Sequence, residues 1–267
     1  MKRHRSHKFI TGCCIAGVLF FCIILGYFWT PYDPEAMDAA AKFASPSLQH
    51  LLGTDNFGRD ILSRVLTGAG TTLYIAVATV VIGLVVGTLV GAFTGYFGGW
   101  VDEILMRCND VITAFPSILL ALVLISLFGS GKHNMILALS LLFIPSFARV
   151  VRSEFAKQKQ LDYVRNARLM GVGNLRIMFV HILPNVLPVL LSTVAIGFNN
   201  AVLAETAMSY LNIGVQLPDT SLGRMLSESQ SYFFSAPWYA LSAGVTIILL
   251  ILSFSLISDG LGVSDNA

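Results

Sequence analysis

The sequence predicts an all-α integral membrane protein with six transmembrane helices. Of the 267 residues, 55% are hydrophobic and 12% are charged, whereas soluble domains carry about 25% charged residues. The apolar residues gather into runs of the length that a helix needs to cross a bilayer. The cysteines lie mainly in the first run and lack the spacing of metal ligands, so we expect no metal site. They are Cys13, Cys14, Cys22 and Cys108.

Residues 1–30 are predicted to form a cytoplasmic N-terminus and a first transmembrane anchor. A basic segment at 1–8 precedes an apolar run at 9–29, which is long enough to span a bilayer. A secretory signal is the alternative. The run ends on Tyr27-Phe28-Trp29, however, where a signal peptidase requires small residues. Aromatic side chains suit the membrane interface, so a retained anchor is the better interpretation.

Residues 31–71 are predicted to form an extracytoplasmic connecting segment, because their composition is polar and mixed and includes three prolines. The string GTDNFGRD (53–60) within it is rich in turn-forming residues. Its charged side chains either brace the outer surface or contact a binding protein, and a structural turn is the first interpretation. They are Asp55, Arg59 and Asp60.

The second span is predicted at residues 72–97, at the start of a transmembrane core that we expect to cover residues 72–261. Glycine recurs here at every fourth position, which lays a groove along one helix face and lets another backbone approach closely. We interpret the groove as a helix-packing surface, with a glycine-lined conduction path as the alternative. The repeat comprises Gly83, Gly87, Gly91, Gly95 and Gly99.

A short polar turn is expected at residues 98–110, followed by a third span at 111–128. Phe115-Pro116 lies early in this span, and a proline inside a helix kinks or unwinds it. We interpret the kink as a packing feature, with a gate as the alternative. The remaining predictions are a fourth span at 135–151, a fifth at 189–210, a sixth at 238–257 and a cytoplasmic tail at 262–267.

A polar, basic segment at residues 158–188, which we name the docking segment, interrupts the apolar runs. Asp162 suits the first turn of a short helix, where a negative charge complements the helix dipole, and Gly171 is placed to end that helix. Apolar positions three apart give the helix a seam. They are Leu161, Val164 and Ala167. We interpret the segment as a surface for a soluble partner rather than as a basic loop held against anionic lipid.

The distribution of Lys and Arg predicts the orientation. With both termini in the cytoplasm, the docking segment lies inside together with most of the 17 basic residues. Five basic residues then lie outside, which satisfies the positive-inside rule. They are Lys42, Arg59, Arg64, Lys132 and Arg224.

Several strings together resemble one family. The stretch RNARLMGVGNLRIMFVHILPN resembles the cytoplasmic signature loop of ABC importer membrane subunits, in which Glu-Ala-Ala, Gly and Ile-x-Leu-Pro or a close variant follow in order. Here Arg165-Asn166-Ala167, Gly171 and Ile182-Leu183-Pro184 occupy those places. The resemblance covers residues 31–261 and is closest to the second, C-type permease subunit of the dipeptide, oligopeptide and nickel branch. It is also carried by LLGTDNFGRDILSRVL, GYFGGWVDEILMRCNDVITAFP, HILPNVLP, SYLNIGVQLP and SDGL.

The resemblance implies a type I ABC importer (MetI-like) permease fold, with residues 72–261 as the permease domain and a coupling helix in the docking segment. It implies a cell-membrane heterodimer with a homologous permease, two cytoplasmic ATP-binding subunits that hold ATP and magnesium, and an extracytoplasmic solute-binding protein. This chain is then expected to bind no cofactor, to catalyse no reaction and to contact lipid but no nucleic acid. The residues implied to couple to the ATPases are Asp162, Tyr163, Val164, Arg165, Asn166, Ala167, Arg168, Gly171, Leu183 and Pro184.

Two positions depart from the family pattern. The usual loop glutamate is Arg165 here, and the first alanine is Asn166. Docking then relies either on Asp162 or on an acidic partner surface that faces Arg165. We favour the second hypothesis, because Arg165 and Arg168 lie three apart on one helix face.

The predicted fifth span holds an acid deep in an apolar run, Glu205. An ionised carboxylate at the bilayer centre costs about 2.5–3.5 kcal/mol on insertion scales, so Glu205 is expected to face protein or water. It is either a hydrogen-bonded structural residue or part of a transport pathway. The candidate pathway and gate residues are Phe115, Pro116, Asn199, Asn200, Glu205, Thr206 and Tyr210.

Di- and oligopeptides are the expected cargo, and nickel or a metal chelate is the alternative, because the resemblance implies both. An ion-coupled secondary transporter is the alternative from a different class. The apolar runs hold few charges and no constellation for a coupling ion, which disfavours it. An intramembrane enzyme requires paired catalytic residues that the spans lack.

Overall fold

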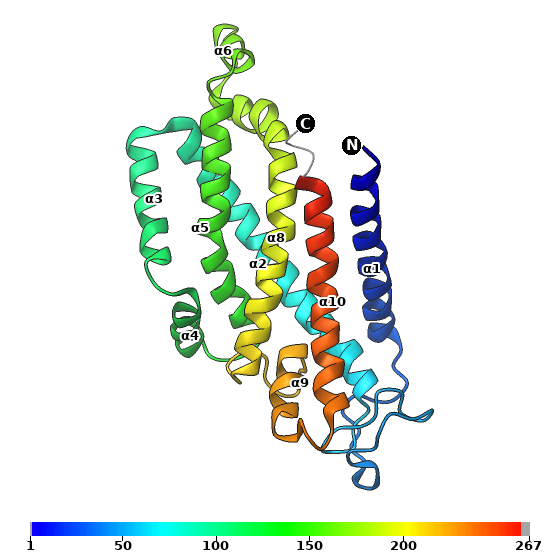
Figure 1. Cartoon of the computed structure of the whole chain (residues 1–267). Coiled ribbons are helices and arrows are strands. Elements are labelled where there is room, and N and C mark those ends of the chain that lie inside the picture. Colours follow the sequence, from blue (N-terminus) through cyan, green and yellow to red (C-terminus); the bar gives the residue numbers. More distant parts are fainter. Residues whose placement is uncertain (1, 263–267) are drawn as a thin grey trace.

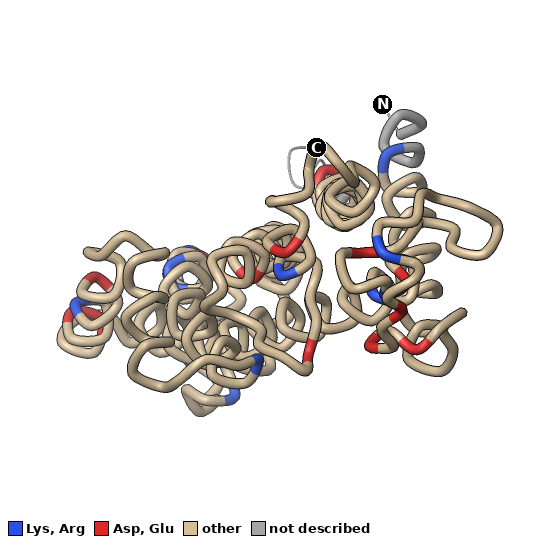
Figure 2. Tube along the Cα trace, turned by 90° about the horizontal axis from the view of Figure 1, so that it is seen from below, with Lys and Arg blue, Asp and Glu red and all other residues tan. Residues whose placement is uncertain are grey.

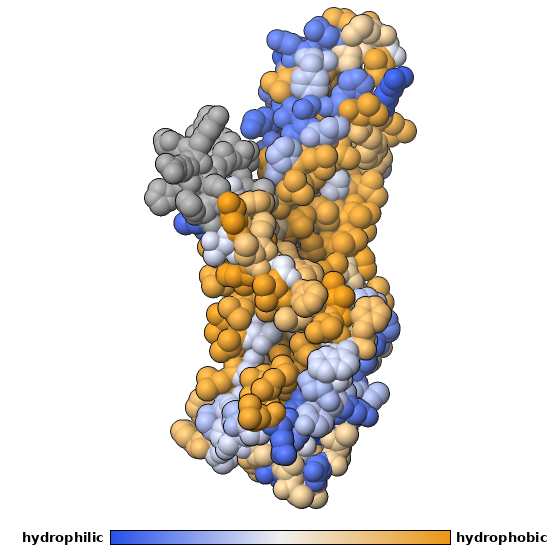
Figure 3. Space-filling view, turned by 90° about the vertical axis from the view of Figure 1, so that its right-hand side faces the viewer, coloured by the Kyte–Doolittle hydropathy of each residue, from blue (hydrophilic) through white to orange (hydrophobic). Residues whose placement is uncertain are grey.

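The computed structural model describes residues 2–262, with the backbone alone at 2–7 and 261–262. Met1 and the predicted tail at 263–267 lie outside the described residues. The described chain is helical throughout, apart from loops and one isolated bridge between Thr54 and Asp60. Long helices lie side by side (Figure 1), and an apolar band separates two hydrophilic ends (Figure 3). The predicted all-α membrane fold is confirmed.

The helices differ greatly in length. The long ones are α1 (Lys2–Phe28), α2 (Ile61–Phe97), α5 (Lys132–Gln158), α8 (Leu183–Tyr210) and α10 (Pro237–Gly262). The shorter ones are α3 (Gly99–Thr113), α4 (Ser117–Phe128), α6 (Asp162–Leu169), α7 (Asn174–Arg176) and α9 (Leu222–Ser229). A π-turn, η2 (Ile177–Ile182), joins α7 to α8, and 3-10 turns form at Ala39–Ala41 and Gln230–Tyr232. Within the described residues, five helices are long and apolar enough to cross a membrane.

The third predicted span, at residues 111–128, falls within a bent pair of helices. The prediction of a polar turn at residues 98–110 is wrong, because Gly99–Thr113 forms α3. The axes of α3 and α4 meet at 89°, so the span count reaches six when the pair is taken as one span. The break falls at Phe115-Pro116, since Pro116 has no N–H to donate and disfavours the helical conformation at Phe115. The kink expected there is thus a full change of direction.

Helix α2 begins earlier than the predicted residue 72. The side chain of Asp60 caps it by accepting a hydrogen bond from the backbone N–H of Ser63 (2.8 Å). The first turns of α2 therefore belong to the segment predicted as an extracytoplasmic connection at 31–71. They were obscured in the sequence by Ser63, Arg64 and Thr67, which break the apolar run.

The glycine repeat lies against α5. A Cβ atom at Gly91 would stand 2.5 Å from the carbonyl oxygen of Ala148, and one at Gly95 would stand 2.5 Å from that of Arg152. Gly83 and Gly87 meet the side chains of Phe143 and Phe147 in the same way. Gly99, the fifth member of the repeat, is different: it begins α3 with φ +53° and has no atom within 4 Å of its Cβ position. The groove thus ends at Gly95, and it brings the α2 and α5 backbones together.

The two ends of the bundle carry different elements. Helix α6 projects beyond one end, where α1 also begins and α10 ends (Figure 1). The segment between α1 and α2 lies at the opposite end with α9 (Figure 1). We refer to these as the α6 end and the α9 end.

Candidate functional site

Helix α6 stands on a small apolar core at the α6 end. Val164 and Ala167 are buried in a cluster that includes Tyr96 of α2 and Phe155 of α5. Leu161, the third member of the predicted seam, precedes the helix and is exposed. Val164 and Ala167 therefore form the buried face that attaches α6 to the ends of α2 and α5.

Polar contacts complete this attachment. The hydroxyl of Tyr163 donates to Oε1 of Gln158, the last residue of α5 (2.9 Å). The guanidinium carbon of Arg168 lies 5.2 Å from the centre of the Tyr96 ring, a cation–π geometry. The hydroxyl of Tyr96 in turn donates to Oδ1 of Asn174 (2.8 Å). Helix α6 is thus tied to α5 and α2, and α2 in turn is tied to α7.

The outer face of α6 is polar with an apolar end. Arg165 and Asn166 are exposed, and Leu169 and Met170 are 86% and 77% exposed. Arg165 lies 3.4 Å from Asp162 in an exposed ion pair. The two residues proposed as alternative docking groups are therefore neighbours, whereas Arg168 turns toward Tyr96. This face is available to a partner.

The backbone after α6 follows the pattern of the signature loop. Gly171 has φ +77°, a conformation that glycine adopts without a steric penalty, and it follows the end of α6. Leu183 and Pro184 are the first two residues of α8. The π-turn before them is of the kind often found at functional sites in helices. Pro188 lies inside α8 and marks the return into the apolar band.

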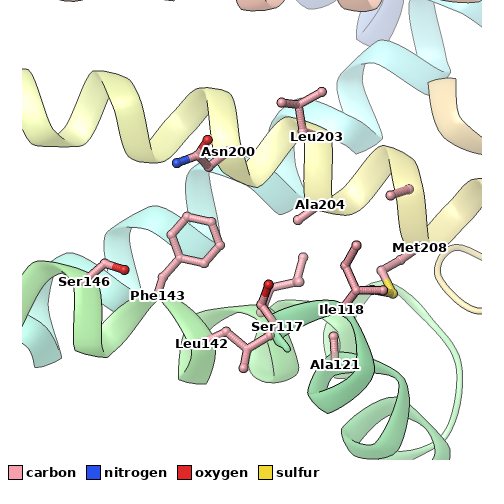
Figure 4. A pocket seen from close by; sticks show the side chains of 12 residues that line it. Ser117, Ile118, Ala121, Leu142, Phe143, Ser146, Asn200, Leu203, Ala204 and Met208 are labelled. Carbon is pink, nitrogen blue, oxygen red and sulfur yellow. The ribbon is translucent and has the colours of Figure 1, made fainter. Parts of the chain in front are cut away.

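A cavity of about 520 Å³ opens between α4, α5 and α8. Its lining is mainly apolar and includes Phe143 of α5 and Met208 of α8. Three polar side chains line it as well, namely Ser117, Ser146 and Asn200, one from each helix. Figure 4 shows the Phe143 ring pointing toward Asn200 of α8, with Ser146 beside it on α5 and Ser117 farther along the cavity.

The predicted pathway residues divide between this cavity and other places. Asn200 lines the cavity, whereas Asn199, Glu205, Thr206 and Tyr210 do not. Phe115 and Pro116 are exposed and precede Ser117 at the cavity wall. Ser146 was missed by sequence reasoning, although its position after Pro145 in an apolar run was a weak signal.

Glu205 is fully buried where α8 meets α2 and α9. Its Oε1 accepts a hydrogen bond from Ser209 (2.8 Å), and the hydroxyls of Thr72 and Ser221 also face the carboxyl group. A Cβ atom at Gly223 of α9 would stand 2.5 Å from the carbonyl oxygen of Thr206, so the helices are in close contact here. This geometry fits the structural interpretation of Glu205.

A buried ion-pair network occupies the α9 end. Arg64 has no exposed surface, and its Nη1 donates to Oδ2 of Asp55 (2.7 Å) and to the hydroxyl of Tyr239 (2.7 Å). Its Nη2 donates to Oε2 of Glu228 (2.9 Å). Arg59 reaches both carboxylates, with 2.7 Å from Nε to Asp55 and 3.2 Å from Nη2 to Glu228. Figure 2, seen from the α9 end, shows acidic and basic positions close together on the side that carries α1.

The network keeps Glu228 ionised. Burial raises the pKa of this carboxyl, but the positive charge of Arg64 and hydrogen bonds from Tyr239, Arg224 and Arg64 lower it more, so the pKa lies below its ordinary value. Sequence reasoning left Asp55, Arg59 and Asp60 either to brace the outer surface or to contact a binding protein, with a structural turn as the first interpretation, and it missed Arg64, Glu228 and Tyr239. The structure favours bracing over an exposed docking role, because Asp55 and Arg59 are themselves buried.

Comparisons with known proteins agree with this geometry. Residues 83–262 match the family described as binding-protein-dependent transport system inner membrane component. A dipeptide transport system permease protein, DppC, of Alkalihalophilus pseudofirmus is 38% identical over 97% of this chain and 86% of its own length. A glutathione transport system permease protein, GsiD, of Shigella flexneri is 40% identical over 96% of this chain and 85% of its own length.

A solved structure has the same fold. The inward-facing MetNI methionine ABC transporter superposes with a TM-score of 0.61 at 18% identity, over 78% of this chain and 97% of that one. The likeness supports the MetI-like fold that the signature loop implied. With the match to the family and the two permease relatives, it leads to one identification. This chain belongs to the family of binding-protein-dependent transport system inner membrane components and is a permease subunit of an ABC importer.

Proposed function

We propose that this permease imports di- or oligopeptides and that α6 couples it to cytoplasmic ATPases. The observation that carries the proposal is the placement of α6. It projects beyond the bundle with Val164 and Ala167 buried beneath it and a polar face outward. Force applied to that outer face reaches α2 and α5 directly, because both helices contribute to the core on which α6 stands.

The same geometry supports the partner set. The α6 end is rich in exposed Lys and Arg, as expected of the cytoplasmic side, and this supports a cytoplasmic location for both termini. Two ATP-binding subunits then supply ATP, magnesium and hydrolysis, and this chain makes and breaks no covalent bond. A homologous permease that faces the cavity between α4, α5 and α8 then completes a pathway. A solute-binding protein delivers cargo at the α9 end.

The nature of the cavity favours peptides over a bare metal ion. Its lining residues include serine and asparagine but no His, Cys, Asp or Glu among the residues that the structure describes. Imidazole is a suitable ligand for nickel, whereas a peptide offers amide groups to neutral hydrogen-bonding side chains. The names of the relatives point the same way, toward dipeptide and glutathione transport. Nickel or a metal chelate remains the alternative cargo.

Vesicles that contain the complete complex test the proposal. Uptake of radiolabelled dialanine is expected to require ATP and the binding protein and to persist when ionophores collapse the ion gradients. Uptake driven by an ion gradient without ATP would show a secondary transporter instead. Uptake of radioactive nickel with no uptake of dialanine or glutathione would assign the alternative cargo.

A further inference from the structure

Two ion pairs fasten α3 to α5 in the half of the bundle that carries α6. Arg152 donates from Nε to Oδ1 of Asp102 (2.5 Å) and from Nη2 to Oδ2 (2.6 Å). Arg149 donates from Nη2 to Oδ1 of Asp110 (3.0 Å) and to the hydroxyl of Thr113 (2.7 Å). We name them the α3–α5 ion pairs. The paired bonds between Arg152 and Asp102 fix orientation as well as separation.

Helix α3 buries little of its own surface. Of its described residues Asn109 alone is buried, and Trp100 and Val111 are exposed. About 12 Å of helix axis separates Asp102 from Asp110, so the two pairs together prevent α3 from pivoting about one point. Partly exposed pairs of this kind stabilise a fold by about 0–1 kcal/mol. Their consequence is therefore the placement of α3 rather than global stability.

The arginines lie on the helix that leads to α6. Arg152 belongs to the last two turns of α5, which ends at Gln158. Gln158 accepts the hydrogen bond from Tyr163 of α6, and Phe155 of α5 packs in the same cluster as Val164. A displacement of α6 therefore moves the segment of α5 that carries Arg149 and Arg152.

The other end of α3 leads to the cavity. Helix α3 ends at Thr113, the partner of Arg149, and the chain turns by 89° into α4. The first turns of α4 supply Ser117, Ile118 and Ala121 to the cavity wall (Figure 4). The far end of α4 is anchored, since Ile125 is buried against α5. A movement of α3 thus changes the position of the first turn of α4 at the cavity.

We infer that Asp102 and Asp110 are positioning residues for transport: through Arg152 and Arg149 they carry displacement of α6 to the α4 wall of the cavity. The inference rests on the proposed coupling through α6. It assigns a role to α3, which contributes no residue to the lining of the cavity.

The experiment measures transport and ATP hydrolysis separately in the reconstituted complex. Asp102→Arg is expected to lower the amount of radiolabelled dialanine imported per ATP hydrolysed by about tenfold, a coupling loss of ordinary size. Association with the ATPase subunits and the rate of ATP hydrolysis are expected to stay close to wild type. The exchange Asp102→Arg/Arg152→Asp is expected to recover much of the transport, which would show that the effect depends on the pairing of these two positions.

Glu154→Arg is the matched control. Glu154 also lies in α5, is exposed to the same degree as Asp102 (20% and 21%), and pairs with Lys157 of its own helix. Transport per ATP is expected to be unchanged in this variant. An unchanged ratio in Asp102→Arg, or an equal loss in Glu154→Arg, would overturn the inference. Neither result bears on the proposed function, whose failure appears instead as loss of ATP-dependent uptake in the wild-type complex.

A second measurement follows the cavity wall itself and uses the milder Asp102→Asn. In a background without the native cysteines, Ser117→Cys is labelled with a membrane-impermeant thiol reagent in the presence and absence of ATP. The labelling rate is expected to change with ATP, and Asp102→Asn is expected to abolish that change. An ATP-dependent change of wild-type size in Asp102→Asn would contradict the inference.

Discussion

Different kinds of interaction stabilise the two ends of the bundle: buried ion pairs at the α9 end and apolar packing at the α6 end. At the α9 end, Arg64, Asp55 and Glu228 are joined by short ion pairs, and the first two are fully buried. At the α6 end, charged Asp162 and Arg165 lie in solvent-exposed positions and the burial is apolar. Removing one partner of a buried pair leaves an unpaired charge, whereas exposed charges contribute little. The α9 end is therefore a fixed framework, and the α6 end is a surface whose charges can change without loss of the fold.

The largest expected effect comes from Arg64→Leu, which tests whether the buried ion pairs stabilise the fold more than the exposed ones do. The substitution leaves Asp55 and Glu228 without their central cation, and loss of one partner of a buried pair costs about 3–5 kcal/mol. We expect a large fall in melting temperature, measured by differential scanning fluorimetry on the detergent-purified complex. Lys132→Ala is the control, since Lys132 pairs with Asp219 and both side chains are more than a third exposed. Equal effects of the two substitutions would contradict the difference between buried and exposed pairs.

The glycine groove lies in the half of α2 that leads to the α6 end, and Gly91→Ala tests how far the fold depends on it. The new methyl group would stand 2.5 Å from the carbonyl oxygen of Ala148, so α2 and α5 must separate. Overpacking of this kind costs about 1–3 kcal/mol. We expect a lower melting temperature and reduced transport. Gly17→Ala in α1 is the control, because no atom lies within 4 Å of that Cβ position, and it should have no destabilising effect.

The α9 end is also expected to be the acid-sensitive one. The pKa of Glu228 is lower in the folded protein than in the unfolded chain. The stability that this difference supplies is complete above the unfolded pKa and is lost as the pH falls through the folded pKa. Melting temperature is therefore expected to decline on acidification through and below the ordinary glutamate range, about pH 4.3. Glu228→Gln should be less stable near neutral pH and show a flatter decline; an unchanged acid profile would refute the assignment.

The smallest effect on stability is expected at the α6 end. Arg165→Glu removes one exposed pair and should change the free energy of unfolding by less than about 0.5 kcal/mol. Its effect is expected in association instead, as reduced recovery of the ATPase subunits on affinity purification. Arg176→Glu reverses another exposed charge of the docking segment and serves as the control. Wild-type ATPase recovery and transport in Arg165→Glu would contradict docking on an acidic partner surface.

The sequence predicted the elements that depend on local pattern. The spacing of Val164 and Ala167, together with Gly171, was enough to place α6, because a helical period and a positive-φ stop are short-range features. The break at Phe115-Pro116 was predictable for the same reason. The repeat from Gly83 to Gly95 indicated a close helix contact but not its partner α5.

Features that depend on contacts between distant segments were not predictable. Arg64 and Glu228 are 164 positions apart, and no local pattern links them. The same limitation affected the pathway: Asn199 and Thr206 share a helix face with each other, but the cavity lies beside Asn200. Only the packing of α4 and α5 against α8 shows which face of α8 is open. Helix α3 was missed because its polar residues are typical of a loop. Their ion-pair partners, Arg149 and Arg152, lie on the distant helix α5.

The length of α2 has a genetic consequence. Its 37 residues make a rod of about 55 Å, well beyond the roughly 30 Å hydrocarbon core. One tip holds Arg64 in the α9-end network, and the other holds Tyr96 beneath α6. A tilt of this rod moves both tips together, so a substitution in the network around Arg64 should change the severity of a defect in α6 on the far side of the bilayer.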